Sequence, residues 1–267
     1  MRIIYIILFI IPLLSFSKGG IKSYNDTLDN KFKLDVSKVS EHIYSRIYDK
    51  YKQTEKDKRK SYRFSNQSAY YISELVSSGK VYSDYDSLEN YVNLIFHKVK
   101  PDYIKNDTMV HAYIIKDGNF NAFMTPSGMT FINIGVFSYI NDESTLAGIL
   151  AHEMAHYYLQ HSLQRFIKEV NREFKDGLLF RNNKRNIFNV KKEIEADSLA
   201  MIWIEQSGYN VSGLKKGFEI ISRLEKNANS KSKRVFDLKT RTHPLGKERL
   251  KSLDKFCTKY STNKGVV

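Results

Sequence analysis

The sequence that decides the fold runs from residue 141 to residue 156 and reads NDESTLAGILAHEMAH. Asn141 or Asp142 can cap a helix at its start, and the apolar side chains that follow recur with the spacing of a helical stripe. His152 and His156 are four residues apart, so they lie on one face of this helix, one turn apart. The stretch therefore predicts a helix that presents two imidazoles side by side.

This histidine pair has the spacing of metal ligands. Both imidazoles can reach one cation at about 2.0–2.1 Å, the usual bond length between zinc and a histidine nitrogen. Glu153 lies one step around the helix, where a carboxylate can address a metal-bound water rather than the metal itself. The alternative is a buried helix with two histidines that form ordinary hydrogen bonds and bind no metal.

A hydrolytic zinc site needs a third protein ligand and leaves the fourth position to water. One known pattern has Gly three residues and His six residues after the second histidine, but this chain has Leu159 and Ser162 there. Because no proline or glycine occurs between residues 149 and 172, we expect His161 on the same helix, pointing elsewhere. We interpret His161 as a surface histidine or a hydrogen-bond partner of a ligand, not as a ligand.

The third ligand is expected from the sequence KKEIEAD at residues 191–197. Glu193 and Asp197 are four residues apart and share a helix face, whereas Glu195 lies on the other side. Glu193 can bind the metal, and Asp197 can accept a hydrogen bond from the far nitrogen of a ligating histidine. The alternative is an ordinary charged helix turn, in which the two lysines pair with the acids.

The first residues are expected to be a signal peptide. Arg2 is followed by an apolar run from residue 3 to residue 14, which is too short to cross a bilayer, and small residues come next. We expect a signal peptide over residues 1–17 and export to the periplasm or cell envelope, with secretion as the alternative. An uncleaved anchor or a buried first helix would give the same pattern.

Composition excludes several classes of protein. The chain has 267 residues, of which 42% are hydrophobic and 27% charged, so it is neither disordered throughout nor a multi-span membrane protein. Its single cysteine excludes a disulfide framework. The net charge of +14 favours anionic membrane surfaces or acidic substrates. Nucleic acid is not an expected partner, because export would separate the chain from it.

The remaining pattern places strands between two helical regions. We expect helices around Val39, Ile43 and Ile47 and over residues 88–99, where Tyr91, Leu94, Ile95 and Lys98 recur. The charged run at residues 52–63 is a solvated helix face or a loop. Strands are expected over residues 110–115 and 129–134, helices from residue 141 to about 256 with a break at Gly208, and a polar loop over residues 226–241. This order favours an α+β fold.

Several motifs, in the same order, resemble the HtpX-like and CAAX-prenyl-protease-like zinc metallopeptidases, metallopeptidase family 48. The similar segments cover residues 91–255 and are Asn121-Ala122-Phe123, Pro126-Ser127-Gly128, Leu146–His156 with His161, Glu193–Asp197, and Arg241-Thr242-His243-Pro244 with Arg249. One departure is Ser127, where relatives often carry a second glycine.

The resemblance implies a mostly helical zincin-type fold with a small sheet beside the active-site helix. It implies one Zn²⁺ per chain held by His152, His156 and Glu193, with Glu153 as the catalytic residue, and endopeptidase activity on protein or peptide substrates. Such substrates would be exported or envelope proteins, including misfolded ones. The domains expected are a helical extension over residues 18–90, a peptidase domain over residues 91–257 and a tail over residues 258–267.

Three roles and two rival functions remain open at this point. His243 could approach the cleft as a gate or an oxyanion donor, or it could pack locally. The strand over residues 129–134 could pair with substrate at the edge of the cleft, or it could be a plain sheet strand, and residues 165–190 could cover the site. One rival function is a chaperone-like or binding module with a structural zinc. The other is a basic protein that binds nucleic acid or a membrane surface, against which the charge is spread over many segments.

Overall fold

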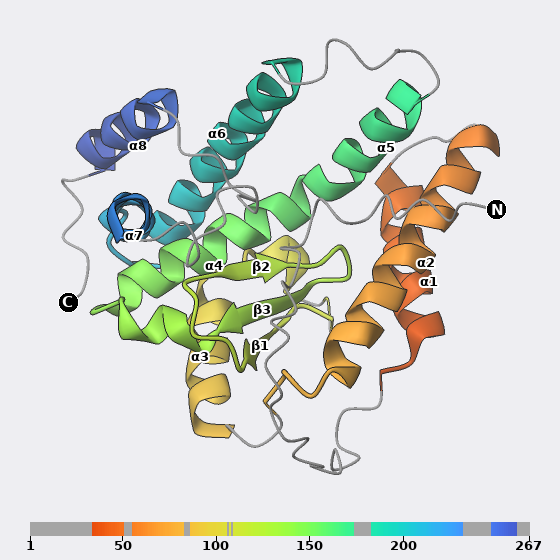
Figure 1. Cartoon of the computed structure of the whole chain (residues 1–267), viewed down its shortest axis with the longest axis horizontal. Helices are drawn as coiled ribbons and strands as arrows, with labels where there is room; N and C mark the ends of the chain where they lie inside the picture. Colours follow the sequence, from red (N-terminus) through yellow and green to blue (C-terminus); the bar gives the residue numbers. More distant parts are fainter. Residues whose placement is uncertain are drawn as a thin grey trace.

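The computed structural model describes residues 34–50, 55–82, 86–105, 107, 109–173, 183–231 and 247–260. Figure 1 shows a small sheet beneath helix α4, with α1 and α2 on one side of the molecule and α6 to α8 on the other. The helices are α1 (Val36–Lys50), α2 (Glu55–Ser77), α3 (Asp86–Val99), α4 (Glu143–Tyr158), α5 (His161–Glu173), α6 (Asn183–Gln206), α7 (Ser212–Lys231) and α8 (Lys247–Tyr260). The strands are β1 (His111–Ile115), β2 (Ala122–Met124) and β3 (Met129–Asn133).

The expected α+β fold is confirmed. Strands follow three helices and precede five more, and short 3₁₀ helices occur at Asp102–Ile104 and Ile134–Ser138. Among the described residues, no helix combines the length and the apolar character that crossing a bilayer requires.

The sheet has the order β1-β3-β2, so β3 is its central strand. β1 runs parallel to β3, with His111 opposite Met129, and β2 runs antiparallel to it, with Phe123 opposite Phe131. The hypothesis that residues 129–134 pair with substrate at an edge is therefore wrong, because neighbours already take both sides of β3. β1 and β2 are the edge strands; residues 80–82 pair with the end of β1 through a bridge between Val81 and Ile115, and no described strand pairs with the outer edge of β2.

Both faces of the sheet are covered, which explains why all five residues of β3 are buried. Ile132 faces a core that it shares with α4, where Leu150 and Met154 are fully buried. Phe131 faces a second core built from α1, α2 and the start of α5. The N-terminal helices thus pack directly on the sheet, although the boundary expected at residue 90 stays a prediction.

Helix α4 begins as its sequence predicts. Asp142 is the N-cap, and its side chain accepts a 2.8 Å hydrogen bond from the backbone N–H of Thr145. Glycine then allows α7 to approach closely: a Cβ atom at Gly148 would lie 2.5 Å from the backbone nitrogen of Leu214, and one at Gly213 would lie 1.9 Å from the carbonyl oxygen of Ser144. This contact lets α4 and α7 pack closely in the two helical turns before His152.

Helix α4 does not extend to His161 as the sequence predicts. It ends at Tyr158, and a new helix begins at His161. Gln160 has a φ of 54°, a left-handed conformation that is uncommon outside glycine, and it interrupts the helix without any proline or glycine. The side-chain amide of Gln160 donates a 3.0 Å hydrogen bond to the backbone carbonyl of Arg46 on α1. This bond stabilises the break between α4 and α5.

Other expectations hold in part. In α1, Val39, Ile43 and Ile47 are buried as predicted, and residues 55–63 of the charged run belong to α2. In α3 the predicted apolar face is out of phase, because Leu94 is 71% exposed and the buried residues are Val92, Ile95, Phe96 and Val99. The loop predicted from residue 226 is helical as far as residue 231, and residues 232–241 lie outside the described part of the chain.

Candidate metal centre

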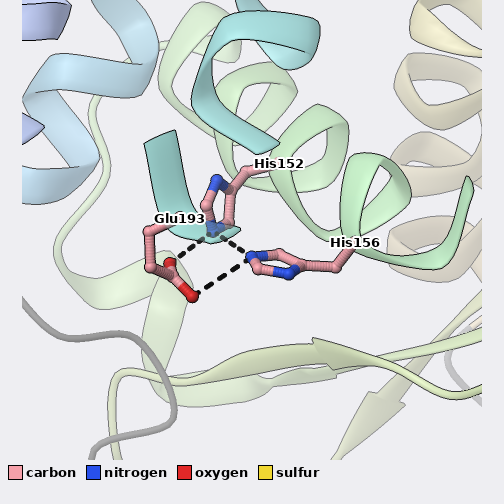
Figure 2. Close-up of side chains that lie close together, drawn as sticks. All are labelled: His152, His156 and Glu193. Atoms are coloured by element: carbon pink, nitrogen blue, oxygen red, sulfur yellow. Dashed lines mark hydrogen bonds and ion pairs between the residues drawn. The ribbon is translucent and has the colours of Figure 1, made fainter. Parts of the chain in front are cut away.

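Three side chains from two helices converge above the sheet. His152 and His156 come from α4 and Glu193 comes from α6, and Figure 2 shows their nitrogen and oxygen atoms pointing toward one another. The two Nε2 atoms are 3.1 Å apart. Glu193 places Oε2 at 3.4 Å from His152 Nε2 and Oε1 at 3.4 Å from His156 Nε2. Among the described residues, these three form the group of His, Cys, Asp or Glu side chains that could hold a metal ion.

The donor set fits a zinc ion. A tetrahedral zinc with bonds of about 2.0–2.1 Å has ligand atoms about 3.3–3.4 Å apart, close to the three separations in this site. Two imidazole nitrogens and one carboxylate are also the donor types that catalytic zinc sites use. The structure therefore brings together the three side chains that the sequence predicts as metal ligands.

Asp197 lies behind His152, where the sequence places it. Its Oδ1 atom is 2.9 Å from Nδ1 of His152, and its side chain is fully buried. Burial alone would lower the pKa of His152, but the hydrogen bonds to Asp197 and Glu193 outweigh that effect and raise this pKa to about 9. Asp197 fixes the ring of His152 so that Nε2 points toward Glu193.

Arg249 is the site residue to which the sequence analysis assigned no role. It comes from α8 and is 1% exposed, and its guanidinium lies 3.8 Å from the ring centroid of Phe218. Nε donates to Asp197 Oδ2 at 2.6 Å and Nη2 donates to Oδ1 at 2.9 Å, while Nη1 is 2.8 Å from Glu193 Oε2. One arginine thus compensates two buried carboxylates, a long-range contact that the local pattern around the acids does not reveal.

His161 is buried against His156, so its interpretation as a surface histidine is wrong. The two Nδ1 atoms are 2.8 Å apart, and His161 Nε2 is 3.3 Å from Glu195 Oε2. Lys192 donates to the same oxygen at 2.7 Å. The break in the helix at Gln160 accompanies this contact between residues that are five positions apart.

The remaining predicted residues are placed only in part. Glu153 is buried on α4, next to His152 in the sequence. His243, the predicted gate or oxyanion donor, lies outside the described residues. Of the predicted cover over residues 165–190, residues 165–173 continue α5 and residues 183–190 begin α6, and the segment between them is not described.

Comparison with known proteins shows a family to which part of the chain is similar. Residues 89–189 match the family model described as Peptidase family M48. Over this segment the chain is similar to peptidase family M48. The match confirms the resemblance predicted from the motifs, and it covers the whole of α4 but ends before Glu193, which the geometry alone brings to the site.

Individual relatives agree with this assignment. The chain is 23% identical over 180 residues to mitochondrial metalloendopeptidase OMA1 of Schizosaccharomyces pombe, an alignment that covers 62% of this chain and 52% of that protein. It is 28% identical over 103 residues to a beta-barrel assembly-enhancing protease of Yersinia pestis, with 39% of this chain and 21% of that protein covered. The chain thus spans about half the length of the first relative and about a fifth of the second.

Proposed function

We propose that this protein is a zinc-dependent endopeptidase with His152, His156 and Glu193 as metal ligands and Glu153 as the catalytic base. The observation that carries the proposal is the donor triangle, with sides of 3.1, 3.4 and 3.4 Å, whose two histidines lie in the segment similar to peptidase family M48. When bound, zinc would polarise the scissile carbonyl and lower the pKa of a coordinated water to about 7.

The other side chains of the site transfer the proton or hold the proposed ligands in position. Glu153 accepts the proton of the attacking water and returns it to the leaving amine. Asp197 holds the tautomer of His152, and Arg249 holds the carboxylates of Glu193 and Asp197 in place by direct hydrogen bonds and ion pairing. His161 supports His156 in the same way from the other end of the histidine pair.

Strand β2 is the element we propose for binding the substrate backbone. Backbone hydrogen bonds join Asn133 to Asn121 and Thr125 to Met129, so in this register the odd-numbered residues of β2 face β3. The N–H and C=O groups of Ala122 and Met124 therefore point to the other side, toward the outer edge of the sheet. An extended peptide could add there as a further strand, which would give affinity with loose sequence preference.

For the substrates, we propose exported or envelope proteins, including misfolded ones, with the periplasm or cell envelope as the location. The apolar N-terminal run supports export, and relatives named as beta-barrel assembly-enhancing proteases support an envelope role. An anionic membrane surface would suit the net charge of +14. Liposome binding that weakens with salt would support this last point, and binding to DNA alone would contradict it.

The experiment pairs metal content with casein hydrolysis for the wild type and for Glu153→Gln. We expect one zinc in both proteins, cleavage by the wild type alone, loss of cleavage with a chelator, and a rate at least about 100-fold lower for the variant. Zinc in both proteins without cleavage by either would favour the rival function, a binding module with a structural zinc. Absence of zinc from the wild type would overturn the proposal.

A further inference from the structure

The two histidines of the candidate metal centre differ in the support that their helix gives them. His156 lies in the last turn of α4, which ends at Tyr158, whereas His152 lies one turn further inside the helix. After this turn the backbone leaves the α-helical pattern, because the N–H of Gln160 donates to the carbonyl of Tyr157, three residues back, at 3.1 Å. The last turn of a helix frays more easily than its interior, so His156 depends on contacts from other elements to stay in place.

Tyr157, the residue next to His156, connects this last turn to a distant part of the chain. Its side chain is buried, and its hydroxyl donates a 2.5 Å hydrogen bond to Oδ2 of Asp107, in the connection between α3 and β1. The turn between β2 and β3 leaves room for this hydroxyl, because a Cβ atom at Gly128 would lie 3.1 Å from its oxygen. Tyr157 therefore anchors the end of α4 to the segments that flank the sheet.

Asp107 is a charged acceptor that several partners hold in place. Burial raises the pKa of Asp107, but the hydrogen bonds from His42 and Tyr157 outweigh burial and hold this pKa below its ordinary value. Nε2 of His42 lies 3.4 Å from Oδ1, and the backbone N–H of Met109 donates to the same oxygen at 3.1 Å. The hydroxyl of Tyr157 thus binds a fixed carboxylate, and a hydrogen bond to a charged group is stronger than one between neutral groups.

Helix α1 reaches the same carboxylate through Arg46. The guanidinium of Arg46 lies 3.5 Å from the ring centroid of Tyr157, and its Nε atom is 4.0 Å from Oδ2 of Asp107. Nη1 donates to the carbonyl oxygen of Pro126, in the turn between β2 and β3, at 3.2 Å. The backbone carbonyl of Arg46 accepts the 3.0 Å hydrogen bond from the side-chain amide of Gln160. One residue of α1 therefore contacts both the last turn of α4 and the break that follows it.

We infer that Arg46, Asp107 and Tyr157 form a clamp that positions His156 for metal binding. All three are positioning residues, because each acts on His156 through the backbone of α4 and not by contact with the metal. The inference rests on the proposed function, in which His156 is a zinc ligand. Helix α1 lies outside residues 89–189, the segment similar to peptidase family M48, so part of the support for the site comes from the N-terminal helices of this chain.

The test compares zinc affinity, measured by competition with a chromophoric chelator, in two variants that each lose one tyrosine hydroxyl. Tyr157→Phe removes the bond to Asp107 and keeps the ring. We expect it to lower the affinity by about tenfold, the lower end of the range for lost hydrogen bonds around metal ligands. Tyr209→Phe is the matched control and should leave the affinity unchanged. Tyr209 is also buried and donates to a carboxylate, that of Glu143 at 3.2 Å, but Glu143 is the first residue of α4, about 20 Å along the helix from His156.

A second pair of variants tests the hydrogen bond to the carboxylate. Asp107→Asn keeps an acceptor for the hydroxyl of Tyr157 and Asp107→Leu has none, so the asparagine variant should retain more of the zinc affinity. Equal losses in this pair would overturn the role of the hydrogen bond.

Two further readouts distinguish positioning from general stability. The visible absorption of Co²⁺ bound in place of zinc depends on the arrangement of its ligands. We expect a changed spectrum for Tyr157→Phe and for Asp107→Leu, and the wild-type spectrum for Tyr209→Phe. At saturating zinc, Tyr157→Phe should lower kcat more than it changes KM, because the clamp acts on the metal site and not on substrate binding.

The outcomes separate the clamp from the peptidase. Wild-type affinity and spectrum in Tyr157→Phe, or equal losses in Tyr157→Phe and Tyr209→Phe, would overturn the clamp, while cleavage by the wild type would still support the peptidase. Zinc binding by the wild type with the expected losses in the variants, but without cleavage, would overturn the peptidase and support the clamp. A wild type that binds no zinc would overturn both.

Discussion

Replacing Arg249 with methionine tests how much this arginine contributes to the stability of the fold by compensating the buried carboxylates of Asp197 and Glu193. The change removes three contacts of 2.6, 2.8 and 2.9 Å to Asp197 and Glu193, whose side chains are both fully buried. Methionine nearly fills the volume, so the main effect is electrostatic. Removing one partner from a buried charge network costs about 3–5 kcal/mol, a large part of a typical unfolding free energy of about 5–15 kcal/mol.

The assay is urea unfolding of the metal-free protein, followed by circular dichroism at pH 7. Lys251→Met is the matched control, because Lys251 is exposed on the same helix, and we expect it to change the unfolding free energy by less than about 0.5 kcal/mol. If Arg249→Met also costs less than about 1 kcal/mol, the carboxylates do not depend on this arginine and the reasoning is refuted.

The pH dependence of the difference provides a second check. Burial raises the pKa of Asp197, but the bonds from Arg249 and His152 outweigh burial and hold this pKa below its ordinary value. A depressed pKa contributes stability above the unfolded-state value, about 3.9, and this contribution is lost as the pH falls through the folded-state value. Without Arg249 the pKa of Asp197 should rise. As the pH falls from 7 toward 4, protonation of Asp197 should then remove its buried negative charge and stabilise the variant. We expect the stability difference to shrink over that range.

Two further predictions concern the other supports of the site. His161→Leu should weaken zinc binding by about 10–100-fold, measured by competition with a chromophoric chelator, because His156 loses the partner of its Nδ1 atom. His161→Asn supplies an acceptor near the same place and should recover most of the affinity; equal losses in both variants would indicate a packing role. Ala122→Pro removes an N–H group that points away from β3, so it should lower kcat/KM on peptides by about tenfold without changing the far-ultraviolet circular dichroism. Unchanged kcat/KM in a folded Ala122→Pro protein would exclude β2 as the substrate-binding edge.

Local spacing predicted which side chains of the candidate metal centre share a helix face. The pairs His152–His156 and Glu193–Asp197 are each four residues apart, and the helix repeat places such a pair on one face whatever surrounds it. The position of Asp142 as a cap follows from the same short-range geometry. The sequence therefore predicted the parts of the site that depend on neighbours within one helical turn.

Features that depend on distant contacts were not predictable in this way. The alternating sequence of β3 does not indicate whether another strand lies on each side of it, so the sequence analysis did not predict its central position. In α3 both candidate faces carry apolar residues, and only packing against α4 and the sheet selects Val92, Ile95 and Phe96. The break at Gln160 has no sequence signal, because a tertiary hydrogen bond to α1 holds it.

The position of Arg249 in the chain has a consequence for biosynthesis. Translation produces both histidines, Glu193 and Asp197 before α8, so a partly synthesised chain contains every proposed metal ligand but not the cation that compensates the acids. Burying those acids without that cation is unfavourable. Burial of these acids in a growing chain should therefore become favourable only once its last described helix has emerged.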